Sequence, residues 1–180
     1  GGSQGAQALN ERVLDALPRL LESYQVIHQT GAASFEENVR VAALVLEKSG
    51  RPTRYHPFGF LNILALRQAA GAADLLLCRA GASTIAELAV WGLPAIVMPL
   101  PSAKGDHQRE NAFAYARGGA AVVIEEANLT TTILVQEVDR LMASVTERER
   151  MANAARAFAR PDAAALIADE LLRLAITHEG

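Results

Sequence analysis

Three segments of this chain have residue types and spacings that could bind a phosphorylated sugar or nucleotide. The first, Gly1-Gly2-Ser3-Gln4-Gly5-Ala6, places glycines and a hydroxyl directly before an amphipathic segment. Loops of this kind join a parallel strand to a helix and present free backbone N–H groups to an anion. A plain strand-to-helix turn is the alternative interpretation. The glycine order fits neither the Walker loop nor the G-x-G-x-x-G dinucleotide loop.

The second segment runs from Arg79 to Glu87 and follows an apolar run that ends at Cys78. Small residues at a helix start could bind a second phosphate, and Arg79 could pair with that phosphate or with a surface carboxylate. Glu87 would lie one turn into the helix, where its carboxylate could accept hydrogen bonds from a ribose diol. Thr84 to Glu87 also fits a capping box, in which Glu87 would only cap its helix. The sequence leaves both interpretations open.

The third segment, from Pro99 to Ala112, contains Asp106, His107, Gln108 and Asn111. Gln108 and Asn111 are three residues apart, so their amides would share one face of a helix. Amides suit sugar hydroxyls because they both donate and accept hydrogen bonds. Taken alone, however, the segment is better explained as an ordinary polar first turn with Asp106 as its N-cap.

Short apolar runs alternate with amphipathic segments, which is typical of a parallel sheet covered by helices. Strands are expected at 24–28, 53–58, 75–78, 95–98 and 121–124, and the run at 75–78 should be fully buried. Helices are expected at about 9–21, 35–50, 62–73, 83–92, 108–117, 131–144, 146–159 and 163–176, with further capping boxes at Ser34–Glu37 and Thr146–Glu149. With one more strand expected before Gly1, they would form a doubly wound, Rossmann-like sheet, and residues 1–180 would form a single domain.

Composition excludes several classes of protein. The chain has 17 Lys+Arg against 20 Asp+Glu, a net charge of −3, which argues against a nucleic-acid partner. A single cysteine favours a reducing compartment, and no apolar run approaches the roughly 18 residues of a membrane helix. We find no Asp-x-Asp and no His/Cys cluster with metal-ligand spacing, so no metal is expected. His28, His56 and His178 lie away from the phosphate-type loops and are expected to be structural or exposed.

Taken together, the motifs resemble the C-terminal domain of the MurG family, in the family's order. The matching segments are Gly1–Ala6, His28–Gly31, Ala73-Asp74 with Cys78–Glu87, Gly92–Ala95 and His107–Ala112. The family transfers N-acetylglucosamine to undecaprenyl-diphospho-muramoyl-pentapeptide, turning lipid I into lipid II. Its GT-B fold has two Rossmann-like domains with the active site in the cleft between them. The resemblance covers all of this chain but implies only about half of the family's protein.

The resemblance implies that this half binds the donor, UDP-N-acetylglucosamine, without a cofactor. The groups implied at the diphosphate are Ser3 and the amides of the neighbouring glycines Gly2 and Gly5, together with the helix start at Ser83 and Thr84. Gln4 and Arg79, in the same two loops, are also expected to bind the substrate. Glu87 would take the ribose hydroxyls. The groups implied at the sugar are the amide of Ala82 with His107, Gln108 and Asn111. The uracil would be held by backbone groups of one residue in this region. Because the segment 59–63 lacks the acidic pair that is usual in the family, that residue could be either Leu61 or Ile63.

The resemblance also implies what this half does not contain. The general base of this inverting transferase would come from an absent N-terminal domain, so no catalytic residue is expected here. The lipid-linked acceptor and the inner membrane face would be reached through that domain, which makes the whole protein cytoplasmic and peripheral. The helices at about 131–177 would pack on the donor domain and toward the absent one. Alternatives are a donor-binding subunit of a two-component transferase and a non-catalytic nucleotide-sugar-binding module.

Overall fold

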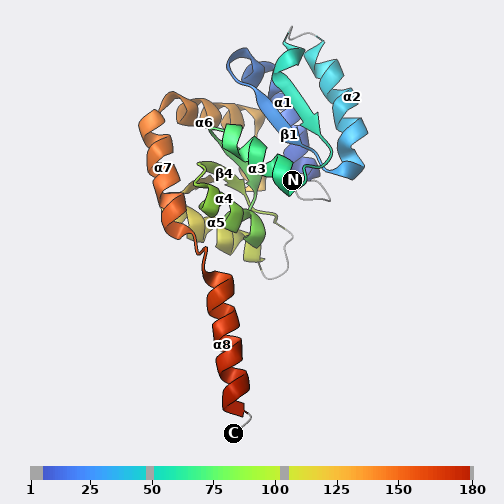
Figure 1. The fold of residues 1–180 in the computed structure, drawn as a ribbon. Helices are drawn as coiled ribbons and strands as arrows, with labels where there is room; N and C mark the ends of the chain where they lie inside the picture. Colours follow the sequence, from blue (N-terminus) through green and yellow to red (C-terminus); the bar gives the residue numbers. More distant parts are fainter. Residues whose placement is uncertain (1–5, 48–50, 102–105, 179–180) are drawn as a thin grey trace.

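The computed structural model describes residues 6–47, 51–101 and 106–178. Helices and strands alternate along the chain, which confirms the predicted α/β class (Figure 1). The elements in chain order are α1 (Gln7–Ser23), β1 (Val26–Gln29), η1 (Ala32–Ser34), α2 (Phe35–Leu46), η2 (Pro52–Arg54), β2 (Tyr55–Phe58), α3 (Ile63–Ala72), β3 (Leu76–Arg79), α4 (Ala82–Trp91), β4 (Ala95–Met98), α5 (His107–Arg117), β5 (Ala121–Val123), η4 (Glu126–Asn128), α6 (Thr131–Ala143), α7 (Val145–Phe158) and α8 (Ala163–His178).

All pairings among the described strands are parallel, as the sequence predicts, and these five strands form two sheets. One sheet has the order β1-β2 and the other the order β3-β4-β5. In a doubly wound sheet the first strand lies in the middle, between the second and the fourth. The orders β1-β2 and β3-β4-β5 match the two parts of such a sheet that lie on either side of its first strand.

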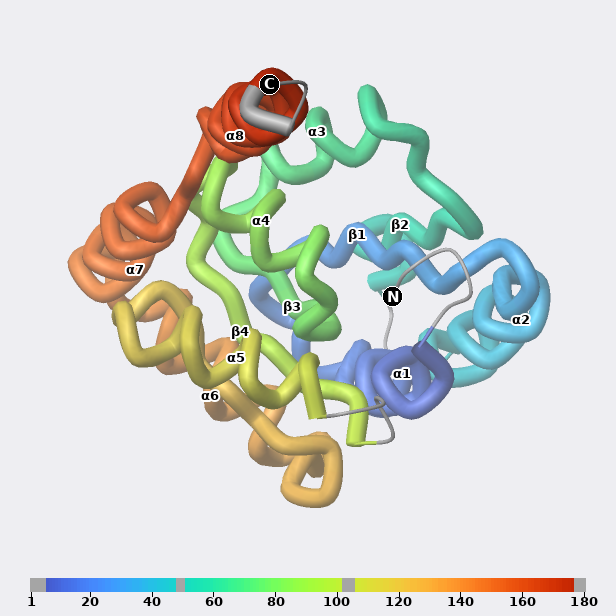
Figure 2. Tube along the Cα trace, turned by 90° about the horizontal axis from the view of Figure 1, so that it is seen from below, coloured from blue at the N-terminus to red at the C-terminus, as the bar shows by residue number. Residues whose placement is uncertain are grey.

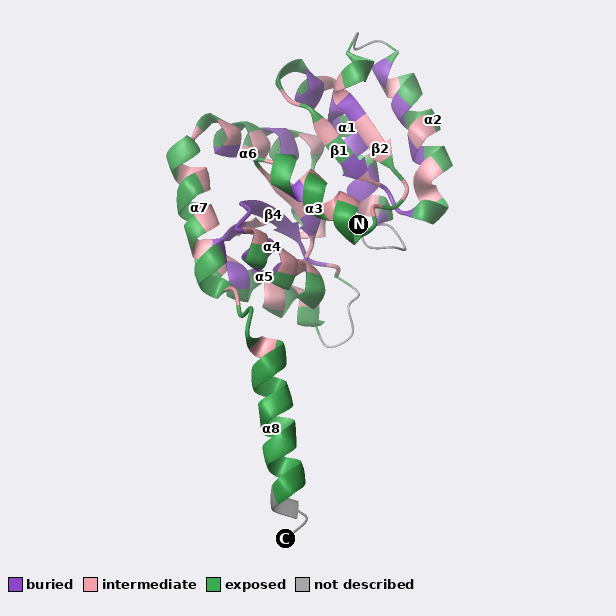
Figure 3. Cartoon of the chain, viewed as in Figure 1, coloured by how far each residue is buried: buried purple, intermediate pink, exposed green. Residues whose placement is uncertain are grey.

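β4 is the most deeply buried strand, and its side chains alternate between two hydrophobic cores. Ile96 and Met98 belong to the core that includes α1 and α6, whereas Ala95 and Val97 belong to the core that includes α4 and α5. All four residues are 0% exposed. Successive side chains of a strand point to opposite faces, so helices cover both faces of this sheet. Figure 3 shows β4 as a continuous buried strip.

β3 is less buried than its apolar sequence predicts. Within the run 75–78 only Cys78 is buried, and the three leucines before it are half-buried. Among the described strands β3 pairs with β4 alone, so its other edge has no neighbouring strand to cover it. The prediction of a fully buried strand is wrong here because burial depends on both neighbours.

The capping box expected at Ser34 is not formed. Ser34 precedes α2, but its side chain makes no capping hydrogen bond. Its backbone, at φ −102° and ψ 1°, continues the turn of η1, whereas a capping side chain needs an extended N-cap residue. Asn38 instead donates a hydrogen bond from Nδ2 to the carbonyl oxygen of Ser34 (2.6 Å).

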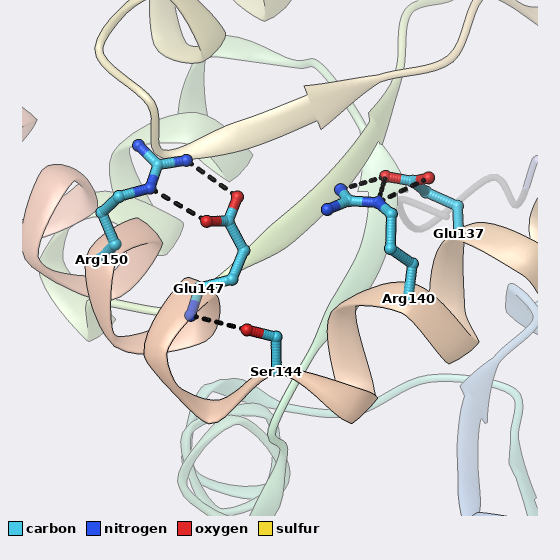
Figure 4. Close-up of polar contacts among 5 residues, drawn as sticks. All are labelled: Glu137, Arg140, Ser144, Glu147 and Arg150. Atoms are coloured by element: carbon cyan, nitrogen blue, oxygen red, sulfur yellow. Dashed lines mark hydrogen bonds and ion pairs between the residues drawn. The ribbon is translucent and has the colours of Figure 1, made fainter.

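The capping box expected at Thr146 is also misplaced, because α7 begins earlier. Its N-cap is Ser144, whose Oγ accepts a hydrogen bond from the backbone N–H of Glu147 (3.2 Å). The Glu147 carboxylate does not reach back to the cap but binds Arg150 through two hydrogen bonds of 2.8 and 3.0 Å (Figure 4). A similar pair on α6, Glu137–Arg140, lies on the other side of the junction.

α8 extends away from the rest of the molecule. Figure 1 shows it below the domain, and Figure 2 shows it end-on at the periphery. From residue 164 to residue 176 every residue is exposed. Its large exposed hydrophobic residues are Leu166, Ile167, Leu171, Leu172, Leu174 and Ile176. α6 and α7, by contrast, contribute buried residues to the cores.

A substitution at the end of α4 tests the local backbone. Gly92 has φ +65°, and its N–H and that of Leu93 both bond to the carbonyl of Leu88. A Cβ at this position would be strained and would meet the side chain of Arg156. We expect Gly92→Ala to lower the free energy of unfolding by about 1–2 kcal/mol, measured by urea denaturation.

The matched control is Gly71→Ala on α3, where an added Cβ would meet nothing within 4 Å. This control should be neutral or stabilising by up to about 1 kcal/mol, since alanine is the better helix former. Equal stability of the two variants would contradict the left-handed conformation of Gly92.

Candidate functional site

A cavity of about 620 Å³ lies where the amino ends of α1, α4 and α5 meet the carboxyl ends of β3 and β4. This is the edge at which ligands bind in doubly wound sheets. The lining residues are Ala6, Gln7, Ala8, Glu11, Arg79, Gly81, Thr84, Leu100, Gln108 and Glu126. An adjoining cavity of about 450 Å³ shares Ala8, Glu11 and Glu126 with the first. Both cavities lie against α1, whose residues Ala8 and Glu11 line each of them.

The cavity brings together three of the residues that the sequence predicts at the site, namely Arg79, Thr84 and Gln108. The predicted residues Gly2, Ser3, Gln4 and Gly5 lie outside the described residues, although the chain that follows them lines the cavity from Ala6 onward. Seven further predicted residues lie near the helix starts but do not line the cavity: Leu61, Ile63, Ala82, Ser83, Glu87, His107 and Asn111.

The start of α4 excludes the capping interpretation of Glu87. The helix begins at Ala82, its N-cap is Gly81, and there is no side-chain capping hydrogen bond. Thr84 therefore lies inside the first turn and cannot be the N-cap, so the capping box that ends at Glu87 does not form. The backbone N–H groups of the first turn have no partner within the helix. The Glu87 carboxylate is half-buried and has no hydrogen bond or ion pair with any described residue.

Arg79 lies at the cavity, but its charge is already paired. Its Nη2 is 2.5 Å from Oε2 of Glu126, and its Nη1 donates a hydrogen bond to the carbonyl of Pro99 (3.3 Å). The contact with Glu126 is an ion pair without hydrogen-bond alignment, since that oxygen has no hydrogen-bond partner among the described residues. The side chain of Arg79 is 13% exposed. Arg79 thus joins the segments that follow β3, β4 and β5.

Sequence reasoning missed Glu126. No local pattern singles it out, because its partner and its neighbours in the cavity come from distant parts of the chain. The sequence did offer an acidic pair, Glu125-Glu126, directly after the last predicted strand, and this position is at the ligand-binding edge of the fold. Glu125 pairs instead with Arg109 on α5 (2.9 Å).

The amides of α5 connect the helix to the loops that surround the cavity. Gln108 accepts a hydrogen bond at Oε1 from the N–H of Leu100 (3.1 Å), and Asn111 donates one from Nδ2 to the carbonyl of Ala80 (3.3 Å). Both side chains therefore face the carboxyl ends of the strands, as their spacing predicts. Asp106 is the N-cap by position only: its φ is +56° and its side chain makes no capping bond. The local prediction of an Asp106 cap is wrong because a capping residue needs an extended backbone, whereas Asp106 is left-handed and its carboxylate lies 3.7 Å from Nη1 of Arg109.

In the segment between β2 and α3, the two residues predicted at a base differ in their backbone contacts. The backbone N–H of Leu61 donates a hydrogen bond to Oε1 of Gln29 (3.1 Å), so this group is occupied. Asn62 caps α3 by accepting a hydrogen bond from the N–H of Ala65 (2.9 Å). Ile63 is the first residue of α3, where backbone N–H groups have no partner within the helix, and it is 68% exposed.

His28 is buried and structural, as its distance from the loops predicts. Its Nδ1 lies 3.0 Å from the hydroxyl of Tyr55, and its Nε2 lies 3.1 Å from Oδ1 of Asn10. Asn10 in turn donates a hydrogen bond from Nδ2 to the carbonyl of Thr30 (2.8 Å). Burial lowers the pKa of His28 to about 4, so the ring is neutral at neutral pH. This network joins α1 to both strands of the first sheet.

Within the described residues, no group of three or more His, Cys, Asp or Glu side chains is placed to hold a metal ion. The one cysteine, Cys78, is buried, and burial raises the pKa of its thiol to about 12. The described helices include none with the length and apolar character needed to cross a membrane.

Comparison with known proteins assigns the family. Residues 1–167 match the glycosyltransferase family 28 C-terminal domain. The chain is 44% identical over 179 residues to the UDP-N-acetylglucosamine–N-acetylmuramyl-(pentapeptide) pyrophosphoryl-undecaprenol N-acetylglucosamine transferase of Anaeromyxobacter sp. (strain Fw109-5), covering 96% of this chain and 45% of the relative. It is 45% identical over 178 residues to the enzyme of the same name from Sorangium cellulosum (strain So ce56), covering 97% and 42%.

The fold agrees with a solved structure. The crystal structure of Acinetobacter baumannii MurG superimposes with a TM-score of 0.82 at 35% identity, covering 96% of this chain and 48% of that chain. This chain thus spans about half the length of the relatives that it matches. Its parallel sheets and the match over residues 1–167 lead to one conclusion: the chain belongs to the glycosyltransferase family 28 C-terminal domain family.

Proposed function

We propose that this chain is the donor-binding part of an inverting glycosyltransferase that moves N-acetylglucosamine from UDP-N-acetylglucosamine to undecaprenyl-diphospho-muramoyl-pentapeptide in peptidoglycan synthesis. The observation that carries the proposal is the cavity at which the starts of α1, α4 and α5 converge. The relatives with the highest identity quoted above are named for this transfer. No cofactor enters the proposal.

The diphosphate would lie at the starts of α1 and α4. Its contacts would be the loop Gly2–Gly5, the first-turn N–H groups of Ser83 and Thr84, and the guanidinium of Arg79. Loss of UDP from the anomeric carbon builds negative charge on the diphosphate. Fixed N–H groups and helix dipoles aimed at that charge stabilise the transition state more than the ground state.

The ribose, the N-acetylglucosamine and the uracil of the donor would be bound by groups around the diphosphate site. Glu87 would accept hydrogen bonds from the ribose diol, since its carboxylate has no other partner among the described residues. The sugar would be read by the amide of Ala82 together with His107, Gln108 and Asn111. For the uracil, we favour Ile63 over Leu61, because the N–H of Leu61 is occupied by Gln29.

The rest of the enzyme would supply the general base, the acceptor site and the contact with the cytoplasmic face of the membrane. α8 is the part of this chain that would dock on such a domain, because its apolar side chains are exposed from Leu166 to Ile176. Burial of six large apolar side chains would contribute on the order of 10 kcal/mol before entropy costs. We place residues 1–180 in one donor-binding domain with α8 as the connection to the second.

Calorimetry tests the proposal directly. The 180-residue chain should bind UDP and UDP-N-acetylglucosamine with a Kd below about 1 mM. It should transfer little or no sugar to a lipid-linked acceptor, since the base is expected in the other domain. Absence of heat with millimolar UDP would overturn the donor-site assignment. Transfer at the rate of a complete enzyme would overturn the assignment of the base to a second domain.

A further inference from the structure

Glu126 places a negative charge at the cavity in which we expect a diphosphate. Among the described residues that line this cavity, the charged side chains are two carboxylates, Glu11 and Glu126, and one guanidinium, Arg79. Glu11 accepts a hydrogen bond from Gln7 on its own helix (3.1 Å), whereas Glu126 faces Arg79. Like charges repel at close range, so the Glu126 carboxylate opposes the binding of a diphosphate. The proposed function gives this residue no role.

The fold holds the segment that carries Glu126. Directly after β5, the N–H of Ile124 donates a hydrogen bond to the carbonyl of Val97 in β4 (3.1 Å). Leu129 is 3% exposed and belongs to the core that includes α1. η4 begins at Glu126, between these two anchors. The carboxylate is therefore presented to the cavity from a segment that is held at both ends.

The contact between Glu126 and Arg79 is one that a better acceptor could replace. Nη2 of Arg79 lies 2.5 Å from Oε2 of Glu126, yet this buried oxygen accepts no hydrogen bond from any described residue. A diphosphate offers several charged oxygens to which a guanidinium can donate in good alignment. The hydrogen bond from Nη1 to the carbonyl of Pro99 (3.3 Å) orients Arg79 without Glu126. Glu126 thus competes for the charge of Arg79 more than it orients the group.

We propose that Glu126 competes with the diphosphate for Arg79 and thereby favours the release of UDP after transfer. The inference rests on the proposed function. UDP ends in a phosphate monoester that is doubly ionised at pH 8, so it carries about one more negative charge than UDP-N-acetylglucosamine. A carboxylate beside the diphosphate therefore weakens the binding of the product more than that of the donor. Since differences in affinity between related complexes lie mostly in the dissociation rate, UDP leaves faster.

The experiment compares the affinities of the 180-residue chain for UDP and for UDP-N-acetylglucosamine by calorimetry at pH 8, with a thermal melt of each variant. Glu126→Gln keeps the size of the side chain and removes its charge. We expect it to strengthen UDP binding about three- to tenfold and donor binding less, so that the UDP/donor affinity ratio rises. Glu126→Ala should shift the ratio in the same direction. Loss of a residue with only a structural role would weaken the binding of both ligands together.

The route through Arg79 and the identity of the carboxylate are tested separately. In an Arg79→Gln background, the change Glu126→Gln should raise UDP affinity less than it does in the wild type, because the cation for which Glu126 competes is gone. Glu125→Gln is the matched control. It removes the adjacent carboxylate, which pairs with Arg109 on α5 (2.9 Å), and should leave the UDP/donor ratio unchanged.

Four outcomes would overturn the competing role of Glu126. They are a wild-type ratio in both Glu126 variants, an equal rise in Glu125→Gln, an undiminished gain in the Arg79→Gln background, and a lower UDP affinity in Glu126→Gln. The last would mean that Glu126 orients Arg79 for the diphosphate. A wild-type chain that binds neither ligand overturns the proposed function instead.

Discussion

Glu87→Ala is expected to weaken UDP binding about 10- to 100-fold while the thermal stability of the chain stays close to wild type. A hydrogen bond to a charged group contributes about 1.5–3 kcal/mol, which corresponds to this loss of affinity. Glu87 is the residue to test for two reasons. Its carboxylate has no other partner among the described residues. It also does not cap its helix, because α4 begins at Ala82.

Two further variants make the result specific. Glu87→Gln keeps one acceptor oxygen and should lose less affinity than Glu87→Ala. Glu149→Ala removes an exposed carboxylate from α7, away from the cavity, and should bind UDP like the wild type. Calorimetry measures the affinities, and a thermal melt measures the stability. Two outcomes would contradict ribose binding by Glu87 and indicate a structural role instead. One is a wild-type UDP affinity in Glu87→Ala, and the other is a loss of stability of about 1 kcal/mol, as expected for a lost helix cap.

Acidification from pH 6.5 to pH 4 is expected to destabilise the chain through His28 by up to about 3 kcal/mol. Burial lowers the pKa of this ring to about 4 in the folded state, whereas the unfolded ring titrates near its ordinary value. Between these two values the unfolded state binds more protons than the folded state, so stability falls as the pH falls. Below the folded pKa this contribution no longer changes.

The difference between wild type and His28→Gln isolates this contribution. Other groups also titrate in this range, but they are common to both proteins. Urea denaturation at pH 7 and pH 4.5 should show a smaller loss of stability for His28→Gln, although its stability at pH 7 is lower because the network with Asn10 and Tyr55 is disturbed. His56→Gln, at a half-buried position in β2, is the matched control. An identical pH dependence in wild type and His28→Gln would contradict a buried neutral ring.

The strands and most helices could be predicted from the sequence because each is encoded by neighbouring residues. The run Ala95–Met98 is apolar and bounded by prolines, and it is indeed the central buried strand. The helix ends at Gly92 and at Gly118-Gly119 could be predicted for the same reason, because a glycine that adopts a left-handed backbone ends a helix locally. The order of the motifs was also enough to indicate the family.

Local patterns failed where several local solutions compete. Three capping boxes fit the sequence, at Ser34, Thr84 and Thr146, and none forms as written. At Thr84 and Thr146 the helix begins earlier than the box predicts, because such a shift costs little in propensity and packing of the whole helix selects its first residue. At Ser34 the N-cap residue is as predicted, but its backbone is not extended. At Thr84 this shift changes the interpretation of Glu87 from a cap to a free carboxylate.

The sequence by itself therefore determined the α/β class, the strand positions and the loops at which a donor could bind. Only the tertiary structure decided how those loops are held: the pairing of Arg79 with Glu126, the bond of Gln29 to Leu61 and the partners of Gln108 and Asn111. Each of these contacts joins residues that different strands bring to one edge of the fold. Such pairings depend on distances across the folded chain, and no spacing along the sequence encodes them.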